Sequence, residues 1–213
     1  FIALGINLID LTLEQVKTCF LHNGLAFIYQ PNHFPIAERL IYYRNEIGKR
    51  PPIASMELIW TAHQGKHLLV SGFVHTPTEE RHWKALELLG EKNFITIKGL
   101  EGSTDLPINK SCTIHHVQQN KINRITLNPK DYSYFGKDIA FTSLNEWQDQ
   151  AMQALNNKGP LRNSLLWNSG FYLWSSGISE SLNSGIKKAQ SLIETGSIQS
   201  TVQSLVNWKD NLT

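Results

Sequence analysis

The amino-acid sequence predicts an α/β fold with a mixed, mostly parallel sheet flanked by helices. Between residues 25 and 97, short apolar runs alternate with longer segments of helical periodicity, the order expected of parallel strands joined by helices. Residues 113–126 hold two β-rich runs around a short polar break, which is typical of an antiparallel hairpin. From residue 144 onward the pattern is almost entirely helical.

The first expected helix lies between Thr12, its candidate N-cap, and Gly24, where a glycine favours termination. Residues 25–29 are apolar and too short for a helix, so they predict a buried strand. The next helix starts at Pro35, and its expected apolar stripe consists of Ile36, Leu40, Tyr43 and Ile47.

Two further strands are expected at residues 68–74 and 94–97, and we predict that they share one sheet. In the helix between them Thr76 or Thr78 is the candidate N-cap, Glu79 and Glu80 suit the positive end of the helix, and Gly90 ends it. Pro129 starts a loop after the hairpin.

Composition limits the function classes. The chain has 213 residues, 41% of them hydrophobic, which is enough for a sizeable core. A net charge of +2 does not by itself indicate a nucleic-acid or membrane partner. Cys19 and Cys112 match no metal-ligand spacing and indicate a reducing compartment. No apolar run approaches the roughly 20 residues of a membrane span. We therefore expect a cytoplasmic protein without membrane contact. The first residue is Phe1, which suggests a processed or truncated chain.

The segment ITIKGLEGSTDLP, residues 95–107, is the candidate ligand loop. It follows a strand, where α/β proteins collect ligands, and Gly99 and Gly102 would let the backbone approach a phosphate closely. Asp105 offers a hard oxygen ligand for Mg²⁺. The alternative is a polar surface turn with solvated acids, and from the loop alone that alternative is favoured because short motifs often match by chance.

Five segments follow one another along the chain: NHFPIAERLIYYRNEIGKR, VHTPTEERHWKALELLG, GLEGSTDLP, ITLNPKDY and LLWNSGFYLWSSG. In their content and order they resemble the anthranilate phosphoribosyltransferases of glycosyltransferase family 3. The resemblance implies that residues 1–213 are the C-terminal portion of the family's α/β domain, with residues 35–62 a helical excursion toward a small α domain. It further implies a homodimer through that small domain, with the glycine-rich loop for phosphoribosyl pyrophosphate (PRPP) upstream of Phe1.

The resemblance also implies site residues. In the family an Asp-Glu pair holds Mg²⁺; here Asp105 matches the Asp, whereas Leu106 replaces the Glu, so the Mg²⁺ site is expected to be weak or lost. We expect Gly99 and Gly102 to bind phosphate, and Leu106→Glu to strengthen Mg²⁺ binding. No catalytic side chain is assigned.

Three residues match the family's substrate-binding positions: His33, Arg44 and Arg50. A guanidinium suits an anthranilate carboxylate, although Arg44 fits equally well a surface pair with Glu38 or Glu46. Phe34 replaces the family's second histidine, and residues 51–65 replace the stretch that walls the acceptor site. These departures disfavour anthranilate as the acceptor.

Three function classes stay open. The first is an active phosphoribosyltransferase that uses PRPP and Mg²⁺ with anthranilate or another aromatic acceptor. The second is a paralogue that binds single-stranded nucleic acid through a cluster of cations, and the third is a relative that keeps only the fold. The cations of that cluster are Arg39, Arg44, Lys49, Arg50 and Lys66. We expect a paralogue without anthranilate transfer.

Overall fold

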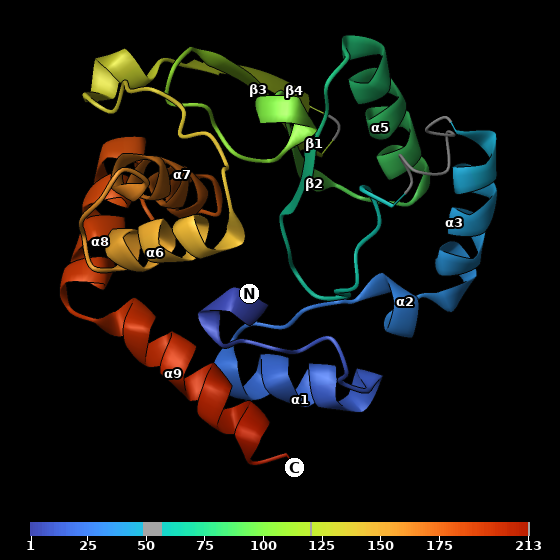
Figure 1. The fold of residues 1–213 in the computed structure, drawn as a ribbon. Helices are drawn as coiled ribbons and strands as arrows, with labels where there is room; N and C mark the ends of the chain where they lie inside the picture. The colour runs from blue at the N-terminus through green and yellow to red at the C-terminus, as the bar shows by residue number, and fades with distance from the viewer. Residues whose placement is uncertain (49–56, 120, 213) are drawn as a thin grey trace. The chain divides into compact units, whose positions relative to one another are not determined.

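The computed structural model describes residues 1–48, 57–119 and 121–212, and the chain forms two compact units (Figure 1). Unit 1 comprises residues 1–51, 141–159 and 191–213, and unit 2 comprises residues 52–140 and 160–190. The α-helices of the described residues are α1 (Leu13–Asn23), α2 (Gln30–His33), α3 (Pro35–Ile47), α5 (Thr76–Leu88), α6 (Leu144–Leu155), α7 (Arg162–Ser175), α8 (Leu182–Glu194) and α9 (Ser197–Asp210).

Unit 2 contains a four-stranded mixed sheet in the order β1-β2-β3-β4. The strands are β1 (Leu69–Gly72), β2 (Asn93–Ile97), β3 (Cys112–Gln118) and β4 (Lys121–Leu127). The pairing of β1 with β2 is parallel, as predicted, and the predicted hairpin is the antiparallel pair of β3 and β4. The expected excess of parallel strands is wrong for the described sheet, because β3 also pairs antiparallel with β2. The loop after β2 reverses the chain without a crossover helix, and only such a crossover would bring β3 back parallel.

The predicted strand at residues 25–29 is also wrong, since these residues, all of them described, form irregular backbone. Ala26 and Phe27 instead pack against the apolar core of unit 1. An apolar run indicates burial, whereas a strand additionally requires a partner for its backbone hydrogen bonds. The sequence shows the apolar run, but it does not show whether a partner strand is available.

Helix α1 has the ends that the sequence predicted. The Thr12 hydroxyl accepts a hydrogen bond from the Gln15 N–H, and the Gln15 side chain accepts one from the Thr12 N–H, forming a capping box. Gly24 ends the helix with a φ of 70°, a left-handed conformation that favours glycine. Within unit 1, α1 packs against α9, with Cys19 fully buried at 0% exposure between them.

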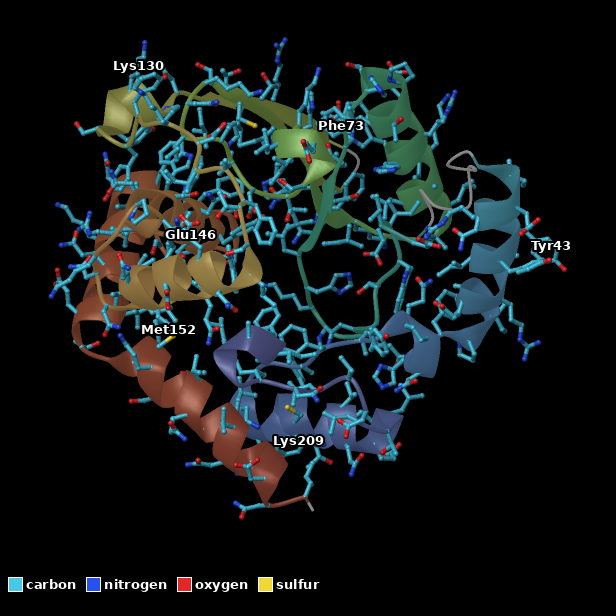
Figure 2. The ribbon with its side chains drawn as sticks, in the orientation of Figure 1. Tyr43, Phe73, Lys130, Glu146, Met152 and Lys209 are labelled. Atoms are coloured by element: carbon cyan, nitrogen blue, oxygen red, sulfur yellow. The ribbon has the colours of Figure 1, made fainter. Side chains whose placement is uncertain are left out.

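Helix α3 forms where the sequence predicted it, but its predicted apolar stripe is largely exposed. Ile36, Tyr43 and Ile47 are 70%, 62% and 60% exposed, and Tyr43 points away from the helix (Figure 2). The buried residue of this helix is Ala37. Helical periodicity therefore located the helix correctly, while the proposed excursion of residues 35–62 to a small α domain stays a prediction.

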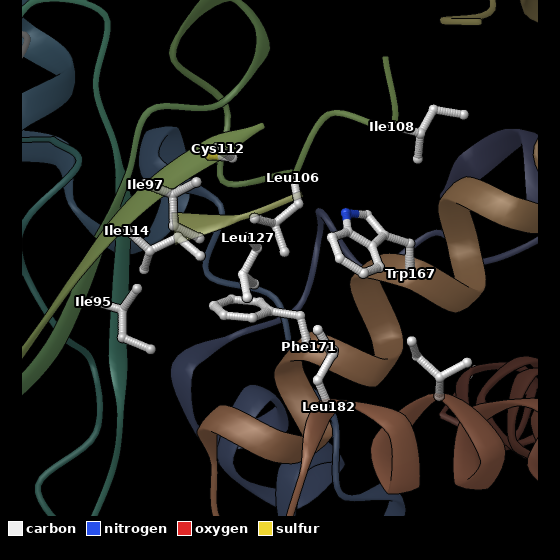
Figure 3. Packing of buried hydrophobic residues seen from close by; sticks show 11 residues of the cluster. Ile95, Ile97, Leu106, Ile108, Cys112, Ile114, Leu127, Trp167, Phe171 and Leu182 are labelled. Atoms are coloured by element: carbon white, nitrogen blue, oxygen red, sulfur yellow. The ribbon is translucent and has the colours of Figure 1, made fainter. Parts of the chain in front are cut away.

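The main core of unit 2 lies between one face of the sheet and helices α7 and α8 (Figure 3). Ile95, Ile97 and Ile114 point from the sheet toward Trp167 and Phe171 of α7. Helices α7 and α8 approach closely where glycine replaces a side chain. A Cβ atom on Gly170 would lie 2.8 Å from the backbone nitrogen of Ile186, so a larger residue there would push the helices apart.

No helix in the described ranges is long and apolar enough to cross a membrane.

The opposite face of the sheet carries α5 and a buried polar network. Glu79 of α5 is 2% exposed, and its Oε1 atom accepts hydrogen bonds from the Thr96 hydroxyl at 2.6 Å and from His115 Nδ1 at 2.7 Å. The Trp83 indole N–H donates to the Thr96 hydroxyl oxygen at 3.0 Å. Nearby, burial lowers the pKa of His82, which faces the Ser71 hydroxyl. A buried carboxylate is tolerated only when it is paired and hydrogen-bonded, so this network fixes the position of α5 on the sheet.

We predict that Glu79→Ala lowers the free energy of unfolding by about 3–5 kcal/mol, because it leaves buried donors without an acceptor. Urea denaturation followed by circular dichroism measures this. Glu80→Ala is the matched control: Glu80 is exposed, and its removal should change stability by less than about 0.5 kcal/mol. Equal effects of the two variants would show that the network does not contribute to stability.

A second charged contact holds the entry to β1. His67 Nε2 lies 2.7 Å from Glu91 Oε2, and His67 Nδ1 lies 2.7 Å from the Gly65 carbonyl oxygen. Both partners only accept hydrogen bonds, so the doubly protonated imidazolium satisfies both contacts. The Gly65 carbonyl and the Glu91 carboxylate accordingly raise the pKa of His67 above its ordinary value of 6.5.

This contact predicts a pH dependence of stability. Since the folded-state pKa of His67 is raised, its stabilising contribution is fully present below about pH 6.5 and is lost as the pH rises through the folded-state pKa. The difference in unfolding free energy between the natural chain and His67→Gln should therefore shrink between pH 6 and pH 9, roughly the range in which histidine titrates. A difference that stays constant across this range would contradict the assignment.

Candidate functional site

The candidate site is the loop of residues 98–108, here called the 98–108 loop, which follows the carboxyl end of β2. Its backbone packs directly on the end of β1. A Cβ atom on Gly72 would lie 2.6 Å from the Ser103 carbonyl oxygen, and one on Gly99 would lie 2.7 Å from the Asp105 carbonyl oxygen. Gly102 has a φ of 85°. Gly99 and Gly102 are thus required by the loop's own close packing and turn, while their predicted contact with phosphate stays a prediction.

Helix α7 holds the 98–108 loop through two side chains, which lie four residues apart on one helix face. The Leu106 N–H donates to Asn168 Oδ1 at 2.7 Å, and Asn168 Nδ2 donates back to the Leu106 carbonyl at 3.2 Å. The Tyr172 hydroxyl donates to the Thr104 carbonyl at 2.7 Å, and burial raises the pKa of that hydroxyl. Loop backbone that is bonded in this way has a fixed shape before any ligand binds.

A pocket of about 290 Å³ borders the loop. Its polar lining comes from Glu101, Ser103, Asp105, Asp138 and Ser164, and its apolar lining includes Leu106 and Ile139. Asp138 accepts a hydrogen bond from the Asn109 side chain. Sequence reasoning singled out only Asp105 among these acids. Glu101 stands inside the quoted loop and could have been included, whereas Asp138 lies too far along the chain for any spacing rule to find it.

The loop gives different surroundings to Asp105 and Leu106, the neighbouring positions at which the family's Asp-Glu pair was expected. Asp105 is exposed, whereas Leu106 is 1% exposed and packs in the main core of unit 2 with Phe171 and Trp167. A carboxylate at position 106 would therefore lie in apolar surroundings, although Leu106 also borders the pocket. Among the described residues, no group of three or more His, Cys, Asp or Glu side chains is arranged to hold a metal ion.

The predicted substrate-binding residues fall in or near unit 1. His33 Nδ1 accepts a hydrogen bond from the Tyr29 N–H at 2.8 Å, and His33 Nε2 lies 2.7 Å from the Leu11 carbonyl oxygen, to which it donates. Both ring nitrogens therefore hold backbone in place. Arg44 lies on α3 and is partly exposed, while Lys49 and Arg50 lie outside the described residues. The 98–108 loop belongs to unit 2, so the convergence of His33, Arg44 and Arg50 on one substrate stays a prediction.

Unit 2 is thus an α/β unit with a fixed, glycine-containing loop at the carboxyl ends of β1 and β2. The sequence matches the family model described as the glycosyl transferase family, a/b domain, over residues 1–199. The chain belongs to this family, glycosyl transferase family 3. Its relatives include the anthranilate phosphoribosyltransferases of Paraburkholderia phymatum, 25% identical over 210 residues, and of Chromobacterium violaceum, 25% identical over 207 residues. It covers 61% and 60% of the length of these two proteins.

Solved structures agree on the fold. Anthranilate phosphoribosyltransferase from Saccharomyces cerevisiae superposes with a TM-score of 0.77 at 14% identity, covering 98% of this chain and 61% of that chain. The enzyme from Thermus thermophilus gives a TM-score of 0.72 at 18% identity, covering 97% and 62%. The yeast enzyme has also been solved in complex with PRPP and Mg, with a TM-score of 0.75 at 13% identity and coverage of 98% and 61%. At these identities the likeness shows the fold alone.

The burial of Leu106 reverses the expectation that Leu106→Glu would strengthen Mg²⁺ binding. We now predict that this variant lowers the free energy of unfolding by about 3 kcal/mol or more, because a carboxylate replaces an apolar side chain in the core. Leu106→Met, which keeps the volume, should lose less than about 1.5 kcal/mol. Urea denaturation measures both, and isothermal titration with Mg²⁺ should show no gain in affinity for Leu106→Glu. A stable Leu106→Glu variant with tighter Mg²⁺ binding would restore the original expectation.

Proposed function

We propose that this chain is part of a phosphoribosyltransferase-like protein that binds a phosphorylated ligand at the 98–108 loop and does not transfer a phosphoribosyl group to anthranilate. The burial of Leu106 is the observation that carries the second half of this proposal. Pyrophosphate departure builds up negative charge that Mg²⁺ must absorb. Of the carboxylate pair expected by resemblance this chain has only Asp105, which is exposed, because the second position is the buried Leu106.

Binding of a phosphorylated ligand is supported by the position and the rigidity of the loop. It stands at the carboxyl ends of the parallel strands β1 and β2, where α/β proteins collect ligands. Ser103 contributes a hydroxyl to the pocket beside the loop, and a phosphate contact of Gly99 and Gly102 is part of the proposal. The related yeast enzyme, of the same fold, binds PRPP and Mg.

The donor set at the loop fits a weak Mg²⁺ site. Mg²⁺ is commonly bound by one or two carboxylates together with substrate phosphates and water. Asp105 would supply the carboxylate, and Ser103 lines the same pocket. When bound, Mg²⁺ would neutralise phosphate charge. The chain's own residues would then hold the loop in shape through Asn168 and Tyr172, so that Asp105 stays exposed to the ligand.

The acceptor side supports the same proposal. Phe34 stands where the resemblance expects a second histidine, and His33 is engaged by the backbone of Tyr29 and Leu11. A reaction between two substrates depends on holding them within about 1 Å of the productive geometry, and a misplacement of that size is worth roughly 10²-fold in rate. Loss of one strong electrostatic contact removes roughly another 10²- to 10³-fold.

We predict no detectable PRPP-dependent loss of anthranilate fluorescence with Mg²⁺ present, using the longest natural form of the protein. The yeast enzyme serves as the positive control. Steady PRPP-dependent turnover that disappears in Asp105→Ala would contradict the proposal. Ligand binding is assayed separately by titration with PRPP and Mg²⁺, where Asp105→Ala should weaken binding and Glu87→Ala, which removes an exposed acid on α5, should not.

Two alternatives follow from the sequence. One is transfer from PRPP to an aromatic acceptor other than anthranilate, which a screen of acceptors with the same protein would reveal. The other is binding of single-stranded nucleic acid, favoured by the exposed Arg39 and the partly exposed Arg44 on α3, just before Lys49 and Arg50. Retention on single-stranded DNA that falls steeply with salt would favour this second alternative.

A further inference from the structure

A second pocket lies at the amino-terminal end of the parallel strands β1 and β2, opposite to the 98–108 loop. It has a volume of about 570 Å³ and sits where β1 and β2 begin and β3 ends. Its principal side chains are those of Lys66, His67, Glu91, Lys92, Asn93 and Gln118, and these residues define the amino-edge pocket. All of them belong to unit 2, and none takes part in the site described above.

The charge in the amino-edge pocket is positive. Of its four charged side chains, Glu91 is paired with His67 at 2.7 Å, so its carboxylate is already neutralised. Lys66 and Lys92 are exposed, and no hydrogen bond or ion pair of their ammonium groups occurs among the described residues. The two lysines therefore leave about two positive charges uncompensated beside a concave surface, which favours an anion.

The wall of the amino-edge pocket is fixed by Asn93. Its Nδ2 atom donates to the His67 carbonyl at 2.9 Å, and its Oδ1 atom accepts from His116 Nε2 at 3.0 Å and from Gln118 Nε2 at 3.5 Å. One side chain thus joins the segment before β1 to β2 and β3. The Gln119 N–H donates to the Lys92 carbonyl at 2.9 Å and so joins the residue after β3 to the residue before β2. A wall braced in this way needs little reorganisation to receive a ligand.

We propose that the amino-edge pocket binds a dianionic phosphate group, free or as a small phosphomonoester, between Lys66 and Lys92, with Gln118 as an amide donor. Two lysines match the two charges of such a group, and lysine binds phosphate as a flexible point charge. A nucleic-acid strand would need cations that continue along a groove, whereas this pocket offers two.

The test is isothermal titration with inorganic phosphate at pH 7, with ionic strength held constant by chloride. We expect saturable binding that weakens about tenfold for each lysine removed, the effect of losing one charge-assisted hydrogen bond, and that is therefore lost in Lys66→Ala/Lys92→Ala. The matched control is Lys84→Ala/Lys188→Ala, which removes two exposed lysines of unit 2 outside the pocket and should bind as the natural chain does.

Two further arms separate this pocket from other sources of binding. Asp105→Ala, which alters the 98–108 loop, should leave phosphate binding unchanged, so failure of the function proposed for that loop does not affect this result. Titration with glycerol phosphate distinguishes the ligands: binding at least as tight as that of phosphate identifies a phosphomonoester, and binding of phosphate alone identifies the free ion. No saturable binding of either anion, equal binding by Lys66→Ala/Lys92→Ala, or an equal loss in the control variant would overturn the proposal.

Discussion

The close approach of the 98–108 loop to the end of β1 is the constraint on which the candidate site depends. The carbonyl oxygens of Gly102 and Ser103 occupy the space that a side chain on Gly72 would need, and those of Ser103 and Asp105 do the same at Gly99. Backbone atoms cannot yield as the end of a flexible side chain can, so two glycines are required at these positions. The loop therefore has a definite shape that its own packing imposes.

That shape decides which neighbouring side chains face solvent and which face the core. Leu106 enters the cluster that joins the sheet to α7, and its backbone is bonded on both sides by the Asn168 amide. Asp105, one residue earlier, is left exposed at the pocket. A pair of adjacent carboxylates would place one of them in apolar surroundings, at a cost of several kcal/mol. At position 106 the packing of the core thus restricts which side chain the loop can carry beside Asp105.

Local signals in the sequence predicted the features that depend on neighbours along the chain. The Thr12 cap and the Gly24 end of α1, the β3–β4 hairpin and the parallel pairing of β1 with β2 were all predicted from spacing and residue type. Features that depend on partners far away in the sequence were not predicted. Residues 25–29 have a strand's composition without a ladder partner in the described chain, and the antiparallel entry of β3 depends on the path of the 98–108 loop. The roles of Asn168 and Tyr172 likewise become visible only when α7 lies against the loop.

Hydrogen exchange at the Leu106 amide is the most direct measurement of whether the loop is fixed by its own contacts. This amide should exchange about as slowly as the amides of β2, since its N–H is bonded to Asn168 at 2.7 Å beneath a buried side chain. Asn168→Ala should speed exchange at Leu106 while leaving β2 protected. Exchange at Leu106 as fast as in the exposed residues of the same loop, such as Leu100, would contradict the claim that the loop is preformed.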